Sequence, residues 1–180
     1  TWIESYVDQL LTRDAALADR RRDPARLRRF LESLALNTAG LVSDQTLYEA
    51  AGIDRRTGLA YEQLLANLMV VESIPAWTTN RLKRLVLRPK RYLVDPALAN
   101  GILRLDESAV LRDGDLLGRF LDTFVAAQLR TEVATSPSRP RLYHLRQEQG
   151  RRELDLLAEL GAERVIGIEG KADSAPDRHD

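Results

Sequence analysis

Charged side chains gather at the ends of two predicted strands near the end of the sequence. Glu153 and Asp155 form the first pair, and Glu169 and Lys171 come directly after the apolar run at residues 165–168. Because side chains alternate across a strand, each pair lies on one face, and neighbouring strands can aim both pairs at one point. Carboxylates beside an ammonium suit a Mg²⁺ ion and the hydrolysis of a phosphate ester.

A salt bridge between Glu169 and Lys171 at a sheet edge would explain the same residues, and spacing alone favours it. The apolar run before this pair favours a site instead, because a buried strand rarely ends in unpaired charges. Both interpretations stay open at this point.

A second group of charges is basic. Residues 81–91 contain no Asp or Glu, although the whole chain balances 27 basic against 27 acidic residues. The basic residues in this strip are Arg81, Lys83, Arg84, Arg88, Lys90 and Arg91. A local strip of this kind suits a polyanion such as nucleic acid, and a solvated hairpin would explain it about as well.

Several other chemistries lack the residues that they need. The chain has no cysteine, which excludes disulfides, thiolate zinc sites and cysteine nucleophiles. It has neither GxxxxGK[ST] nor GxGxxG, so no standard ATP or dinucleotide site is expected in this chain. His144 is the sole histidine of its predicted strand, and such a residue is more often structural than a ligand. No long apolar run or signal peptide occurs, so we expect a cytoplasmic protein without membrane contact.

The elements that must position these charges begin with helices. Residues 2–11 and 24–35 each place apolar side chains at helical spacing. Residues 43–57 predict a short helix, a tight turn at Gly52 and a second helix capped by Asp54. This order is the helix-turn-helix outline.

The second helix of this pair is predicted to face a nucleic-acid backbone or groove. Its inward residues are predicted to be Leu59, Leu64, Leu65 and Leu68. Its start and outer side are predicted to present Arg55, Arg56, Thr57, Tyr61 and Gln63.

The basic strip lies in the segment after this helix. Residues 69–74 are strand-like, residues 75–80 form a turn, and residues 85–87 and 92–94 return as extended chain. Helices succeeded by a two-stranded wing predict a winged-helix domain over residues 24–103. The predicted nucleic-acid-binding residues are Arg55, Arg56, Thr57, Arg81, Arg84, Arg88 and Lys90. A domain that only packs against other protein modules remains the alternative.

The remainder of the chain predicts an α+β domain. A short helix at 95–103 precedes a boundary before Gly114, and a helical face runs over residues 117–129. Three strands are then predicted at 142–146, 153–158 and 164–169, separated by turns at Gln149-Gly150 and at Gly161. A helix with a β-meander after it gives the α+β class.

These motifs together resemble a known family. Asp155, with Glu169-Gly170-Lys171 after an apolar strand, is similar to the PD-(D/E)XK nuclease signature. The motif order, which covers nearly all of the chain, resembles the C-terminal module of bacterial and archaeal ATP-binding proteins of the AAA class. The further segments that carry this resemblance are residues 6–14, 30–40, 88–95, 118–125 and 143–146.

The resemblance implies a division of the chain and a set of site residues. It implies a helical connector at 1–23 from an absent ATPase domain, the winged helix, and a C-terminally incomplete PD-(D/E)XK-like domain at 104–180. Asp155 and Glu169 would be the Mg²⁺ ligands and Lys171 the catalytic lysine, with Arg146 matching a family arginine. Asp122 stands where the family usually has Glu, as the remaining catalytic position. ATP would bind only through the absent domain.

Two functions of different class are expected on these grounds. The first is a fragment of an AAA-class ATP-binding protein that binds DNA and hydrolyses phosphodiesters with Mg²⁺. The second is a catalytically silent DNA- or protein-binding module of that ATPase, which the shorter side chain of Asp122 favours. The expected partners are DNA and the protein's own ATPase domain, and self-association is left open.

Overall fold

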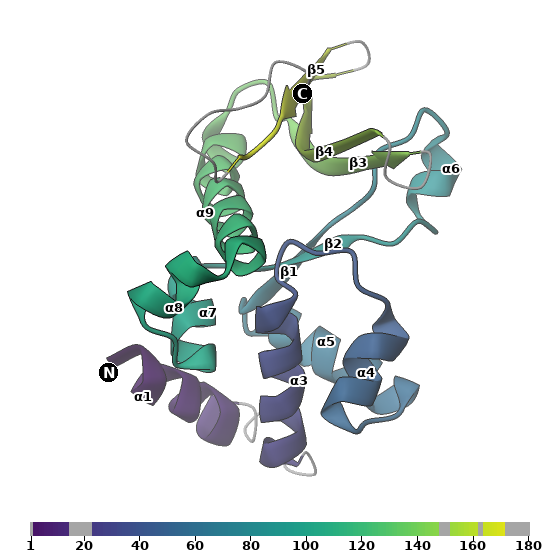
Figure 1. The fold of residues 1–180 in the computed structure, drawn as a ribbon. Helices are drawn as coiled ribbons and strands as arrows, with labels where there is room; N and C mark the ends of the chain where they lie inside the picture. The colour runs from purple at the N-terminus through teal and green to yellow at the C-terminus, as the bar shows by residue number, and fades with distance from the viewer. Residues whose placement is uncertain (1, 15–22, 148–151, 162–163, 172–180) are drawn as a thin grey trace.

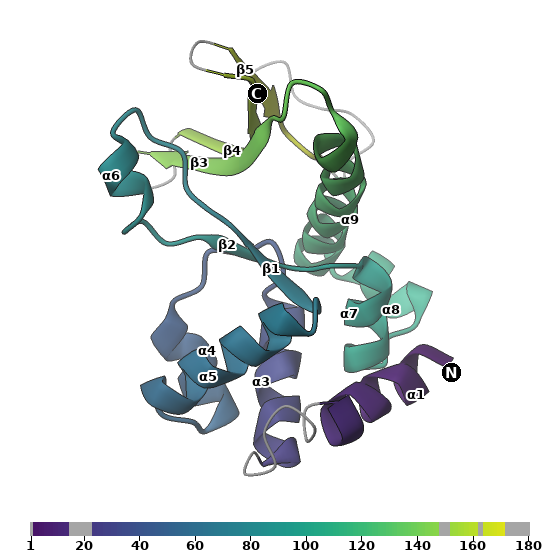
Figure 2. The same cartoon turned by 180° about the vertical axis from the view of Figure 1, so that it is seen from behind.

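The computed structural model describes residues 2–14, 23–147, 152–161 and 164–171 and shows an α+β protein, as predicted. Helices build the first part, and a long helix with a three-stranded sheet builds the last part. A two-stranded sheet crosses between these parts in both views (Figures 1 and 2).

The first part confirms the predicted helices and their caps. Its elements are α1 (Trp2–Gln9), the π-helical η1 (Leu10–Asp14), α3 (Pro24–Leu36), α4 (Asp44–Ala51) and α5 (Arg55–Asn67). The side chains of Asp23, Ser43 and Asp54 accept backbone N–H bonds at the starts of α3, α4 and α5. Gly52 ends α4 in the left-handed conformation that glycine adopts without strain, with φ of 66°.

One face of α5 differs from the prediction. Leu59 is 49% exposed, whereas Tyr61, predicted to point outward, is 3% exposed. The hydroxyl of Tyr61 donates to the backbone oxygen of Asp23 at 3.3 Å. The inward face is set by Gly58, because a Cβ on this residue would lie 2.3 Å from the ring of Tyr48. That close approach of α5 to α4 turns Leu59 toward solvent.

The two-stranded sheet consists of β1 (Val71–Ile74) and β2 (Lys90–Leu93), which pair antiparallel. The connection between them contains the short helix α6 (Arg81–Arg84), capped by the side chain of Asn80. The prediction of extended chain at 85–87 was wrong, because these residues continue from α6 as a hydrogen-bonded turn. The strip of basic residues is therefore divided among a helix, a turn and a strand.

The last part confirms the predicted helix and meander. Its elements are α7 (Pro96–Leu103), α8 (Glu107–Arg112), α9 (Gly114–Thr135), β3 (Arg141–Gln147), β4 (Arg152–Glu159) and β5 (Val165–Ile168). The order β3-β4-β5 is antiparallel throughout. Helix α8, capped by Asp106, was not predicted. The predicted turn at Gln149-Gly150 lies outside the described residues.

A small apolar cluster joins the two parts of the protein. Its members are Ala39, Ile74, Tyr92, Ala126 and Leu156. The buried hydroxyls of Thr38 and Thr123 also meet, at 2.8 Å. Strand β2 therefore faces both the helices of the first part and the sheet of the last. Within the described residues, none of the helices has the length and apolar character of a membrane span.

Candidate functional site

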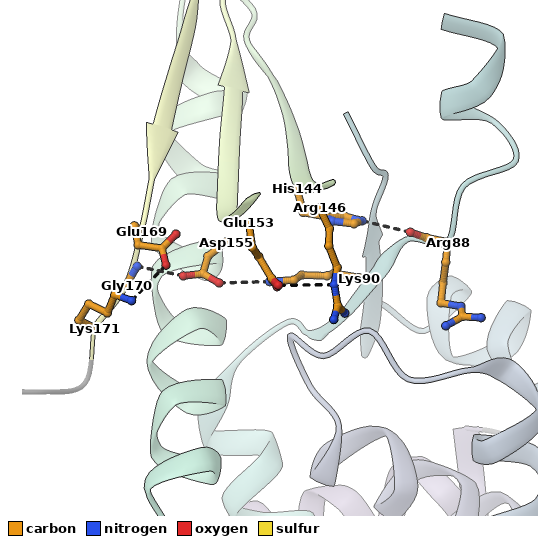
Figure 3. A network of polar contacts seen from close by, with 9 residues as sticks. All are labelled: Arg88, Lys90, His144, Arg146, Glu153, Asp155, Glu169, Gly170 and Lys171. Atoms are coloured by element: carbon orange, nitrogen blue, oxygen red, sulfur yellow. Dashed lines mark hydrogen bonds and ion pairs between the residues drawn. The ribbon is translucent and has the colours of Figure 1, made fainter. Parts of the chain in front are cut away.

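The ammonium of Lys90 lies among the carboxylates of β4 (Figure 3). Its Nζ is 3.2 Å from Asp155 Oδ1 and 3.6 Å from Glu153 Oε1. Lys90 is only 3% exposed, although lysine is usually a surface residue. Strand alternation places Glu153 and Asp155 on the same face of β4, as predicted. Lys90 thus supplies one cation of this face from the other half of the chain, and Arg146, whose Nε is 3.5 Å from Glu153 Oε2, supplies another.

The second predicted pair lies beside the first. β5 ends at Ile168, whose partner on β4 is Leu156, so Glu169 comes next to Asp155. The backbone N–H of Gly170 donates to Asp155 Oδ2 at 3.1 Å. Lys171 Nζ is 3.6 Å from Glu169 Oε1, so the predicted salt bridge is also present.

Asp122 of α9 completes what we call the acidic site, which comprises Asp122, Glu153, Asp155 and Glu169 together with Lys90. A Cβ on Gly170 would lie 2.9 Å from Asp122 Oδ1 and 3.9 Å from Asp155 Oδ2. Burial, together with the smaller effect of the charge of Asp155, raises the pKa of Asp122 to about 7. Burial and Asp155 also raise the pKa of Glu169. Carboxylates from three elements therefore converge at Gly170.

Two buried polar groups beside the acidic site were not predicted as site residues. Among the described residues, Tyr92 Oη and His144 Nδ1 are buried without a hydrogen-bond partner. Burial, with smaller contributions from Asp122 and Asp155, raises the pKa of Tyr92. His144 Nε2 lies 3.1 Å from the backbone oxygen of Arg88, and burial lowers its pKa. Lys90 and Tyr92 lie two residues apart on β2 and therefore on one face of the strand.

The acidic site does not fit a Mg²⁺ ion in this arrangement. Over the described residues, no group of three or more His, Cys, Asp or Glu side chains is placed to hold a metal ion. One oxygen of Asp155 contacts Lys90 and the other accepts from Gly170. An internal ammonium stands where a hard cation would need these oxygens. A cavity of about 380 Å³ lies beside the site, and its lining includes Asp122, Asp155, Lys90, Arg119 and Arg146.

The predicted nucleic-acid-binding residues divide into exposed and internal groups. Arg55 and Arg56 are exposed at the start of α5, and Arg81 and Arg88 are exposed on the β1–β2 connection. The hydroxyl of Thr57 donates to Asp54 Oδ2 at 2.9 Å, which gives Thr57 a capping role.

Arg84 belongs to the internal group with Lys90. Its Nη1 and Nη2 donate to the two carboxylate oxygens of Glu159 at 3.0 and 2.9 Å. The guanidinium also lies over the rings of Trp77 and Tyr143, 5.4 and 4.8 Å from their centroids. This contact ties α6 to β3 and β4, so Arg84 is a structural residue here.

We predict that Glu159→Gln lowers the free energy of unfolding by about 1 to 2 kcal/mol at neutral pH, because a charge-assisted bidentate pair is lost. Hydrogen bonds from Arg84 lower the pKa of Glu159 from 4.5 to about 2. The stabilisation is therefore present above pH 4.5 and is lost as pH falls toward 2. Urea denaturation at several pH values measures this difference.

Glu132→Gln, a change at an exposed position of α9, is the matched control for Glu159→Gln. The control should leave both the stability and its acid dependence unchanged. A Glu159→Gln variant whose deficit stays constant from neutral to acidic pH would contradict the assignment of this ion pair.

Two families match the chain. Residues 1–109 match a domain of unknown function (DUF8612). Residues 117–180 match another domain of unknown function (DUF4143), which occurs in ATPase-associated proteins. No curated protein and no solved structure matches the chain significantly.

Proposed function

The chain belongs to the DUF8612 family, and from the geometry of its site we propose that it is a nucleic-acid-binding module of an ATPase-associated protein. Its acidic site is catalytically silent in this proposal, and its expected location is the cytoplasm. The observation that supports a catalytically silent site is the ion pairing of Lys90 with Asp155 and Glu153. A carboxylate that an internal ammonium neutralises attracts a second cation weakly.

The arrangement of the first part supports DNA binding. Three helices and then two antiparallel strands occur in the order of a winged helix. In such domains the start of the last helix approaches the DNA, and Arg55 and Arg56 are exposed at that position of α5. Arg81 and Arg88 add positive charge on the connection that would serve as the wing. The match of the last part to a domain found in ATPase-associated proteins supports an ATPase as the partner in the same chain.

Salt-dependent binding of duplex DNA to the full-length parent protein tests this proposal. Each phosphate contact contributes about 0.9 to the slope of log affinity against log salt concentration. We expect Arg55→Ala/Arg56→Ala to lower this slope by about 2 and the affinity at low salt by about tenfold. The control Arg104→Ala/Arg112→Ala removes the same charge from the residue that follows α7 and from α8, and it should change little. Equal slopes for wild type and the α5 variant would overturn the proposal.

A second candidate function is Mg²⁺-dependent phosphodiester hydrolysis. The convergence of Asp122, Asp155 and Glu169 near Gly170 favours it, as does the unpartnered hydroxyl of Tyr92. The test compares the wild-type parent protein with its Asp155→Asn and Lys171→Ala variants. Each is incubated with labelled single- or double-stranded DNA in the presence of Mg²⁺ or Mn²⁺. The silent site predicts no metal-dependent cleavage. Cleavage by wild type that both variants lose would establish the nuclease instead.

A further inference from the structure

A cavity distinct from the acidic site lies between α6 and the β3–β4 hairpin, which are neighbours in both views (Figures 1 and 2). Its volume is about 540 Å³, large enough for a nucleotide-sized group. It lies at the end of the hairpin where Arg141 pairs with Glu159, whereas Arg146 and Glu153 mark the end near Lys90. We call it the arginine cavity, and the residues that define it are Arg81, Arg84, Leu85, Arg139, Arg141 and Tyr143.

The arginine cavity carries excess positive charge. Four arginines and one glutamate line it, and Arg84 occupies both oxygens of that Glu159. Arg81, Arg139 and Arg141 are exposed, and none of them makes an ion pair or side-chain hydrogen bond within the described ranges. Three arginines without a carboxylate partner among the described residues therefore line one recess. Guanidinium forks match the oxygens of a phosphate group.

One wall of the cavity is fixed by side-chain contacts, and the exposed side chain of Leu85 makes part of its rim apolar. Tyr143 is buried, and Arg84 is fixed on it by the ring contact and by Glu159. Leu85, on the rim, is 82% exposed, and its neighbours Leu82 and Val86 are exposed as well. Single-strand sites combine a basic groove with apolar side chains, most often aromatic ones, against which unstacked bases pack. Leu85 on this rim would contact an unstacked base while the arginines hold the backbone.

We propose that the arginine cavity binds a phosphate group of a single-stranded nucleic acid. The inference rests on the proposed nucleic-acid-binding function and adds a second contact region to it, apart from the start of α5. A duplex keeps its bases stacked inside, so it offers nothing to the apolar rim. A single strand satisfies the guanidinium groups and the rim together, and a free nucleotide shares only the phosphate chemistry.

Binding of a labelled single-stranded oligonucleotide, ADP and inorganic phosphate to the full-length protein tests this proposal. We expect Arg139→Ala/Arg141→Ala to weaken oligonucleotide binding about tenfold and to lower the salt slope by about 1.4, because each lost contact contributes about 0.7 on a single strand. Lys83→Ala/Arg112→Ala is the matched control, since it removes two charges that do not line the cavity. Lys83 belongs to α6 itself, which makes it a close comparison.

The outcomes separate this inference from the proposed function. If the cavity variant binds the oligonucleotide like wild type while Arg55→Ala/Arg56→Ala loses duplex affinity, the cavity proposal falls and the function stands. If the cavity variant alone loses affinity, the cavity stands and the role of α5 falls. A further outcome is that the protein binds ADP as tightly as the oligonucleotide and that the cavity variant loses this binding. That result would overturn the proposal that the phosphate comes from a single strand. Thermal unfolding of each variant controls for loss of fold.

Discussion

Replacing Lys90 with methionine is expected to lower the free energy of unfolding by about 2 to 3 kcal/mol at neutral pH, because it leaves the half-buried carboxylate of Asp155 without its cation. Lys90 is 3% exposed and contacts both Asp155 and Glu153. Methionine keeps most of the side-chain volume, so the loss reports the charge rather than a cavity. Urea denaturation monitored by circular dichroism measures the change.

The double variant Lys90→Met/Asp155→Asn separates electrostatics from packing. Removing the charge of Asp155 as well should restore about half of the lost stability, since replacing both partners costs less than orphaning one. Lys83→Met, at an exposed position of α6, should stay within about 0.5 kcal/mol of wild type. A Lys90→Met variant as stable as Lys83→Met would show that Lys90 does not neutralise the acidic site.

Lys90 also shows where prediction from the sequence ended. The cap residues Asp23, Ser43 and Asp54 act on backbone a few residues away, so the helix starts could be predicted. The basic strip gave no such local signal. The carboxylate that Lys90 contacts is 65 residues away along the chain, and that of Arg84 is 75 residues away. Both predictions for this strip, contact with nucleic acid and a solvated hairpin, placed these two side chains on the surface, whereas tertiary packing made them internal.

The acidic site was predictable in part. Strand alternation placed Glu153 with Asp155, and the meander brought Glu169 beside them. That Asp122 belongs to the site was predicted only from the family resemblance. Asp122 lies on a helix far before β4 in the chain, so its spacing from the other carboxylates does not indicate that they meet. Tyr92 was missed because a single aromatic residue in a strand is usually core, and its ring does belong to the apolar cluster. Only its unpartnered hydroxyl distinguishes it.

Asp122→Asn is expected to stabilise the protein by about 2 to 4 kcal/mol above pH 7, because a raised carboxyl pKa costs about 1.4 kcal/mol per unit. The pKa of Asp122 rises from 3.8 to about 7 in the folded state, chiefly through burial. Below pH 3.8 the carboxyl is neutral in both states and costs nothing. Between the two values the unfolded chain releases the proton while the folded one keeps it, so stability falls as pH rises. Asparagine cannot ionise and avoids this loss.

Denaturation of wild type and Asp122→Asn at about pH 4, 6 and 8 tests this linkage, and the gain should grow with pH and then level off above about 7. A gain that is independent of pH would mean that the carboxyl of Asp122 is not desolvated. The same experiment repeated with added Mg²⁺ distinguishes the two proposed functions, because a bound cation would favour the ionised form of the Asp122 carboxyl. The silent site predicts that Mg²⁺ leaves the difference at about pH 8 unchanged. If Mg²⁺ instead stabilises wild type and not the variant, the acidic site exchanges Lys90 for a metal, and the nuclease becomes the better account.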